Sequence, residues 1–197
     1  MGIATDIHRI LRERTRPFHD ALEGKLGVLI SEGISLDEYK AVQKKFYGFY
    51  KPVEMRIFSI GDWDEPELEL ERRRKLPLLV EDMSFLAGAE DEIAGCPCCR
   101  SLPRLETAGE AMGCLYVLEG STLGGRIITG HVKKILGLDE NRGCAFFNSY
   151  GIDVGAMWKR FLRVLSDHCE RYGDAETVVE SACQTFLSLD RWLSNVE

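Results

Sequence analysis

Apolar residues recur at helical spacing along most of this chain, and this periodicity limits its possible folds more than any other feature. An early stretch carries them at Ile7, Ile10, Leu11, Phe18, Leu22 and Leu26, and the next at Tyr39, Val42, Phe46, Phe49 and Val53. Such spacing is typical of amphipathic helices, each with one apolar face. Because no alternating strand pattern competes with it, the sequence predicts an all-α fold.

Local signals mark where individual helices begin or end. Residues Ser35 to Glu38 have the sequence of a capping box, which predicts a helix start. Pro66, close to Asp64, predicts a third helix start, and we expect Pro77 to kink or end that segment.

The second half of the chain follows residues 88–103, which form the longest helix-breaking stretch. After it come a glycine-rich apolar segment from Leu105 to Leu136, a loop around 137–153, and amphipathic helices near 154–172 and 175–195. With 197 residues, 45% of them hydrophobic, the chain is long enough to bury a substantial core. We therefore predict a single domain over residues 1–197, folded as a multi-helix bundle.

Charge and cysteine content limit the partners and the compartment. A net charge of −7 argues against a nucleic-acid-binding protein, and no apolar run is long enough to span a membrane. Charged residues from Asp6 onward interrupt the apolar segment that a secretory signal requires. The seven cysteines are an odd number, and four lie within apolar segments: Cys114, Cys144, Cys169 and Cys183. We expect a reduced, cytoplasmic protein with no membrane or nucleic-acid partner.

Three cysteines lie close together at Cys96, Cys98 and Cys99. Thiolates are ligands for zinc and iron–sulfur centres, but no second cysteine pair stands at the spacing that such a site usually has. We therefore interpret them as oxidisable thiols in a surface loop.

Among the four histidines, His19 is the strongest candidate for a metal ligand. Glu23, four residues later, shares its helical face and could accept the second ring N–H, as the partner of a metal-bound imidazole does. Taken alone, the pattern also fits a structural histidine. We expect His8 near a frayed terminus and His168 at a helix end, either solvated or interacting with the helix dipole, whereas His131 could be a core or a surface residue.

Six glycines lie within the segment Leu105–Leu136, at positions 109, 113, 120, 124, 125 and 130. Each costs a helix interior roughly 0.5–1 kcal/mol relative to alanine. Gly120 and Gly124 are one turn apart, so their face could lie directly against a flat ligand. Close helix–helix packing is the alternative interpretation.

Two stretches together resemble a known family. LRERTRPFHDALE (Leu11–Glu23) and YVLEGSTLGGRI (Tyr116–Ile127) look like the proximal-histidine helix and the glycine-rich distal helix of the haem (heme) oxygenase family. The segment Gly143–Leu165 is similar to the bacterial, biliverdin-forming branch associated with bacteriophytochromes. The resemblance implies a single all-α haem-oxygenase-like bundle in which haem lies between the two helices.

The resemblance also implies roles for individual residues. His19 falls on the iron ligand and Glu23 on its acidic partner, while the distal glycines fall on Gly120, Gly124 and Gly125. Basic positions that flank the haem edge fall on Arg12 and Arg16, and one that holds a propionate falls on Arg163. Arginine suits that task because its planar guanidinium matches a carboxylate.

The sequence departs from the family pattern at Ser121, where many members have an aspartate that anchors a water network for oxygen activation. A hydroxyl carries no negative charge and accepts fewer hydrogen bonds than a carboxylate. The bacterial branch shares the GSTLGG form, so we do not interpret Ser121 as loss of activity. The group that delivers protons stays unassigned.

The activity that the resemblance implies is oxidative cleavage of haem to biliverdin, carbon monoxide and ferrous iron. Haem is then both substrate and cofactor, and dioxygen is the co-substrate. Electrons must come from an external ferredoxin or reductase, because the chain has no flavin or nicotinamide fingerprint. A bacteriophytochrome is a candidate recipient of the biliverdin.

Two other classes of protein compete with this interpretation. A non-catalytic haem-binding or haem-trafficking protein would keep His19 and the arginines without turnover. A thiaminase-like or di-iron oxidase protein could share the helical fold, but a di-iron site needs several Glu and His ligands on different helices.

Overall fold

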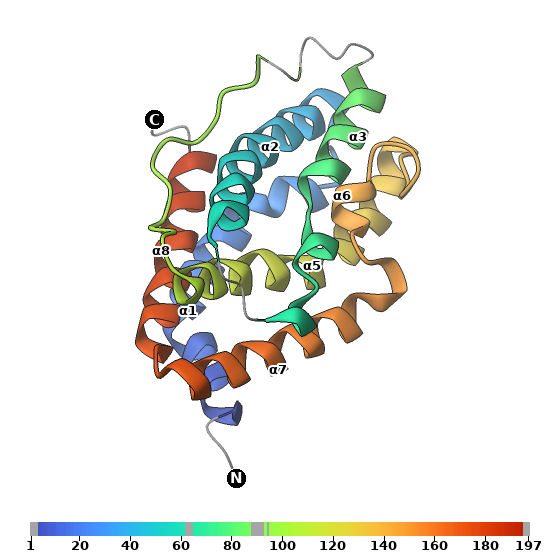
Figure 1. Ribbon diagram of the computed structural model, residues 1–197. Coiled ribbons are helices and arrows are strands. Elements are labelled where there is room, and N and C mark those ends of the chain that lie inside the picture. The colour runs from blue at the N-terminus through green and yellow to red at the C-terminus, as the bar shows by residue number, and fades with distance from the viewer. Residues whose placement is uncertain (1–3, 62–64, 88–92, 94, 195–197) are drawn as a thin grey trace.

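The computed structural model describes residues 4–61, 65–87, 93 and 95–194 of the chain. Helices dominate these residues, and they contain two isolated β-bridges but no strand (Figure 1). The prediction of an all-α fold is confirmed.

Six long helices account for most of the structure: α1 (Ala4–Leu26), α2 (Leu36–Ser59), α3 (Leu76–Ala87), α5 (Ala108–Leu136), α7 (Val154–Tyr172) and α8 (Ala175–Leu193). Shorter elements connect them: η1 (Gly27–Ile30), η2 (Pro66–Leu68), η3 (Leu70–Arg73), α6 (Ala145–Asn148) and η4 (Gly151–Asp153).

Capping boxes begin two of the long helices. The predicted one at α2 is present, because the Ser35 side chain accepts from the Glu38 N–H and the Glu38 carboxylate accepts from the Ser35 N–H. Thr107 and Glu110 form a second, unpredicted box at the start of α5. Each box satisfies backbone donors that a helix start leaves without partners.

Two of the predicted boundaries differ from the structure. Pro77 lies in the first turn of α3, where its missing N–H costs nothing, so it neither kinks nor ends a helix. Pro66 does begin an element, although this is the short 3₁₀ helix η2, and Asp64 lies outside the described residues. The expected loop around 137–153 contains the helical turns α6 and η4.

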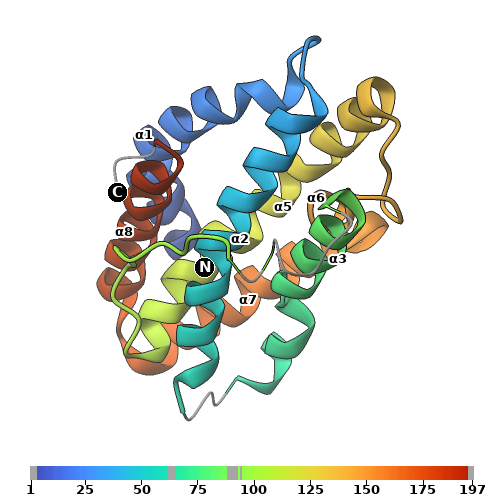
Figure 2. The same cartoon turned by 90° about the horizontal axis from the view of Figure 1, so that it is seen from above.

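Helix α5 crosses the middle of the molecule in both views (Figures 1 and 2). It packs against α8, α7 and α6, while α1 packs against α8 and α7. The contacts bury a continuous apolar core with members on every long helix, among them Leu11, Phe49, Leu79, Met112, Phe161 and Val178. Because α1 and α5 both rest mainly on α7 and α8, one face of each helix is left for other contacts.

Candidate functional site

Four of the predicted site residues form a stripe on α1, which we call the histidine face: Arg12, Arg16, His19 and Glu23. They recur every three or four residues, and all four are exposed. The adjacent side of α1 carries Ile7, Leu11 and Leu22 into the core. The amphipathic pattern of α1 thus places the predicted ligand and its basic neighbours on the surface together.

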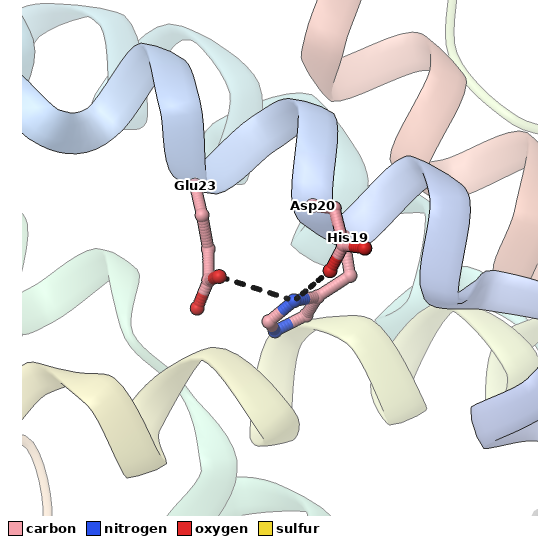
Figure 3. Close-up of side chains that lie close together, drawn as sticks. All are labelled: His19, Asp20 and Glu23. Carbon is pink, nitrogen blue, oxygen red and sulfur yellow. Dashed lines mark ion pairs between the residues drawn. The ribbon is translucent and has the colours of Figure 1, made fainter.

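His19 has its carboxylate partner beside it. The His19 side chain is 55% exposed, and its Nδ1 lies 3.8 Å from Glu23 Oε2 and 4.0 Å from Asp20 Oδ1 (Figure 3). Both His19 and Glu23 leave α1 on the side where α5 is drawn (Figure 3). A carboxylate beside Nδ1 favours a proton on that nitrogen, which leaves Nε2 as the ring's electron-pair donor.

The glycine face of α5 consists of Gly120, Leu123, Gly124 and Ile127. Leu123 is 44% and Ile127 70% exposed, although both are large and apolar. A Cβ built on Gly124 meets nothing within 4 Å, and one built on Gly120 meets the Trp158 ring at 3.7 Å, an ordinary contact. This face is therefore apolar and bare, which suits a flat apolar ligand.

Gly125 has a different environment. A Cβ on Gly125 would collide with the backbone carbonyl of Phe147 in α6, and one on Gly113 would collide with the Val178 carbonyl in α8. Close packing thus explains these two glycines, whereas it does not explain Gly124. Both interpretations of the glycine-rich segment apply, each to different residues.

Contacts beyond each end of the glycine face link α5 to the α1–η1 region. Tyr116 hydrogen-bonds Thr15 of α1, and burial raises the pKa of Tyr116 despite the nearby Arg12 charge. His131 Nε2 lies 2.8 Å from the Ser31 carbonyl oxygen, just after η1. His19 and the glycine face lie between these two contacts along their helices.

His8 is not at a frayed end, contrary to expectation. Its ring lies edge-on to Tyr116 and Trp158, with centroids 6.2 and 6.0 Å away. Burial, together with the nearby Arg12 charge, lowers the pKa of His8. His8 is therefore a packing residue beside the first contact between α1 and α5.

Ser121 already uses its hydroxyl within the protein. Its Oγ donates to the Leu118 carbonyl at 2.7 Å and lies 3.3 Å from the Tyr50 hydroxyl. The next residue, Thr122, donates to the Glu119 carbonyl at 2.7 Å. Such bonds to preceding carbonyls compete with the helix ladder and can bend a helix at this position.

Arg163 is the predicted site residue that lies on a different helix from the rest. It extends from α7, and its Nη2 lies 2.5 Å from Glu67 Oε2 of η2. A cleft of about 360 Å³ beside it is also lined by Lys159 and Arg160. Arg163 would have to exchange Glu67 for any ligand carboxylate.

His168 corrects another expectation, since it is buried rather than solvated. Only 2% of its side chain is exposed, and its ring nitrogens lie 3.1 Å from Glu65 Oε1 and 3.0 Å from Asp174 Oδ2. His168 thus joins η2 to the turn between α7 and α8.

Sequence reasoning missed a buried ionic cluster beside the glycine face. Glu119 pairs with Arg73 and Lys75, and Tyr150 donates to it at 2.8 Å. The one available signal was a glutamate inside the otherwise apolar stretch before Gly120. Its partners come from distant segments, which the sequence alone does not bring together.

The metal-binding alternatives can be compared with the geometry. Over residues 4–61, 65–87, 93 and 95–194, one group of three residues could hold an ion, namely His19, Asp20 and Glu23, all on α1. A di-iron site would draw ligands from several helices. All seven cysteines are described and none forms a disulfide; Cys99 is buried, and its N–H donates to the Gly48 carbonyl.

Within the described part of the chain, no helix is long and apolar enough to cross a membrane.

Comparison with known proteins agrees with the all-α fold. A family model described as heme oxygenase matches residues 5–195. Heme oxygenase from Leptospira interrogans has a similar structure, with a TM-score of 0.76 and 18% identity over 98% of this chain and 99% of that one. Heme oxygenase-1 from the cyanobacterium Synechocystis sp. PCC6803, in complex with heme, has a TM-score of 0.75 and 17% identity over 100% of this chain and 93% of that one. No curated protein matches the sequence.

Proposed function

Because this chain belongs to the heme oxygenase family, we propose that it cleaves haem oxidatively to biliverdin, carbon monoxide and ferrous iron. Dioxygen would be the co-substrate, and an external ferredoxin or reductase would supply the electrons. The GSTLGG sequence of residues 120–125 further supports a place in the biliverdin-forming branch that serves bacteriophytochromes.

One observation carries this proposal: His19 and Glu23 leave α1 on the side where α5 is drawn (Figure 3), and α5 is the helix that carries the bare glycine face. A porphyrin is flat and apolar, with a metal at its centre and carboxylates at one edge. The glycine face offers apolar surface without side chains at Gly120 and Gly124, and the histidine face offers an imidazole and two arginines. The residues present therefore fit the group.

On the α1 side, we assign the iron ligand to His19 Nε2. The Glu23 carboxylate, 3.8 Å from Nδ1, would favour a proton on that nitrogen and so keep the imidazole in the tautomer that can ligate. Arg12 and Arg16 pair with the propionates, where a guanidinium can form two parallel hydrogen bonds to each carboxylate. Arg163 would contribute a third cation after leaving Glu67.

On the α5 side, Gly120 and Gly124 would let the helix backbone approach bound haem, and Gly125 holds α5 tightly against α6. Haem, once bound and reduced, supplies the oxygen chemistry. Ser121 and its neighbour Tyr50 are the polar side chains at the start of this face, and they would hold water near the reacting edge. Leu123 and Ile127 would exclude bulk water.

The electron donor and the recipient of biliverdin belong to the proposal as partners of the protein. The thiol form of all seven cysteines is compatible with a reducing, cytoplasmic location, where such donors work.

The test is turnover by the purified protein with haem, a ferredoxin–reductase couple and dioxygen. We expect bile-pigment absorbance to appear as the haem Soret band declines, together with release of carbon monoxide. A Soret band that persists without bile pigment would instead identify a haem-binding or haem-trafficking protein and would overturn the proposed activity.

A further inference from the structure

The buried cluster beside the glycine face comprises Arg73, Lys75, Glu119 and Tyr150. The side chains of Arg73 and Glu119 are 1% exposed and that of Lys75 is 2% exposed. The Glu119 carboxylate accepts from Arg73, from Lys75 Nζ at 3.2 Å and from the Tyr150 hydroxyl at 2.8 Å. Burial of so many charged groups is costly unless each is paired, and here each of them is.

The remaining donors of the cluster connect further elements. Arg73 donates to the Leu68 carbonyl at 2.7 Å, and Lys75 donates to the Tyr150 hydroxyl at 2.6 Å. Nearby, Glu54 of α2 accepts from the Lys75 backbone N–H at 2.6 Å. The cluster therefore joins α5 to α2, η2, η3 and the segment before η4.

The backbone conformation of two residues near the cluster indicates that the surrounding structure keeps this arrangement in place. Among the described residues, the non-glycine residues with positive φ are Glu69, at 49°, and Ser149, at 45°. Glu69 links η2 to η3, which ends at Arg73, and Ser149 directly precedes Tyr150. Such conformations persist only where the surroundings enforce them. The segment that leads to Arg73 and the segment that leads to Tyr150 both supply partners to Glu119, and each contains one residue of this kind.

The position of Glu119 on α5 links the cluster to the glycine face. Glu119 directly precedes Gly120, and successive residues of a helix are rotated by about 100°, so its side chain leaves α5 at the edge of the glycine face, one turn before Leu123. Glycines weaken the helix over residues 120–125, where Ser121 and Thr122 also bond preceding carbonyls. This weak stretch is held at its N-terminal end by Glu119.

We propose that Glu119 is a positioning residue, which acts through the backbone of Gly120 and Gly124 and sets where the glycine face lies relative to bound haem. The proposal rests on the proposed function for its catalytic consequence, but its structural part holds in the protein without haem. Tyr150 assists by keeping the Glu119 carboxylate in place.

The first test is hydrogen exchange of the haem-free protein, because it does not depend on activity. In Glu119→Gln, we expect amides of residues 120–125 to exchange at least about tenfold faster, since a charge-assisted anchor is lost. In Tyr150→Phe, which keeps the carboxylate and both cations, we expect a smaller increase at the same amides. Glu71→Gln breaks an exposed pair with Arg74 and serves as the matched control.

The second test is the isomer composition of the bile pigment formed by each folded variant. A changed isomer ratio in Glu119→Gln, with Glu71→Gln like the wild type, would support positioning. Unchanged exchange at residues 120–125, or faster exchange spread evenly over all helices, would overturn it. If the wild type forms no bile pigment, the proposed function fails, and the exchange data still decide the role of Glu119.

Discussion

The sequence could predict the placement of some residues on the histidine face and the glycine face, but not of all of them. The spacing of His19 and Glu23 placed both on one helical face, and the structure brings Nδ1 to 3.8 Å from the carboxylate. The sequence could not separate Gly124, which faces open space, from Gly125, which touches α6, because that distinction depends on residues far along the chain.

Replacement of His19 by alanine should abolish the histidine-ligated haem spectrum, because the chain then loses its proposed iron ligand. The measurement is the absorption spectrum of the haem complex in its ferric and ferrous forms. His131→Ala is the matched control, since His131 is bonded to the Ser31 carbonyl and is expected to leave the spectrum unchanged. A normal spectrum in His19→Ala, with a changed one in His131→Ala, would transfer the assignment to His131.

Adjacent glycines provide a paired test of the glycine face. Gly124→Leu should fold with nearly wild-type stability but bind haem weakly, because the new side chain occupies the bare face. Gly125→Leu should lower the free energy of unfolding by more than about 2 kcal/mol, since the side chain would displace α6. Urea unfolding and haem titration measure the two effects. Equal losses of stability in both variants would contradict the assignment of separate roles.

Short elements around α5 were the least predictable part of the fold. The long helices and the start of α2 follow from periodicity and a capping box, whereas α6 is only four residues long and lay within an expected loop. It is held by Asp82 of α3, whose carboxylate accepts from the Ala145 and Phe146 N–H groups at 2.7 and 2.8 Å. Long-range bonds of this kind leave no local sequence pattern.

The Asp82 contact predicts how stability changes with pH. Burial raises the pKa of Asp82 from 3.8 to about 6. A raised pKa means that the folded state binds the proton more tightly than the unfolded chain does. The contribution of Asp82 to the free energy of unfolding is therefore complete below about pH 4 and is lost as the pH rises through 6. The loss of unfolding free energy should reach about 3 kcal/mol.

Urea unfolding of the wild type and of Asp82→Asn between pH 4 and pH 7.5 measures this contribution. The advantage of the wild type over the variant should shrink as the pH rises. Asp167→Asn, at an exposed position of α7, is the control and should follow the wild type at every pH. Parallel curves for wild type and Asp82→Asn would contradict the prediction.

At the scale of the whole molecule, the all-α fold and the two helices of the site were predictable, because both depend on patterns within single segments. The buried pairs were not: His168 with Glu65 and Asp174, and Glu119 with Arg73, join segments far apart in sequence. Charged residues usually lie at the surface, so their burial is visible only once the fold brings partners together.

Haem should stabilise the whole protein, because the folded state presents the glycine face and the unfolded chain does not. At free haem concentrations roughly 100 times Kd, the expected gain in unfolding free energy is about 2.7 kcal/mol. Thermal unfolding at increasing haem concentration measures it. His19→Ala should show little of this gain, and an unfolding temperature independent of haem in the wild type would argue against binding at this face.

The bare glycine face also has a cost outside catalysis. Without a ligand, Leu123 and Ile127 expose apolar surface to water and the glycines weaken the central helix. Proteins of marginal stability are cleared faster when their unfolded fraction rises. The cellular lifetime of this protein would therefore follow the supply of its own substrate, with fewer copies kept when haem is scarce.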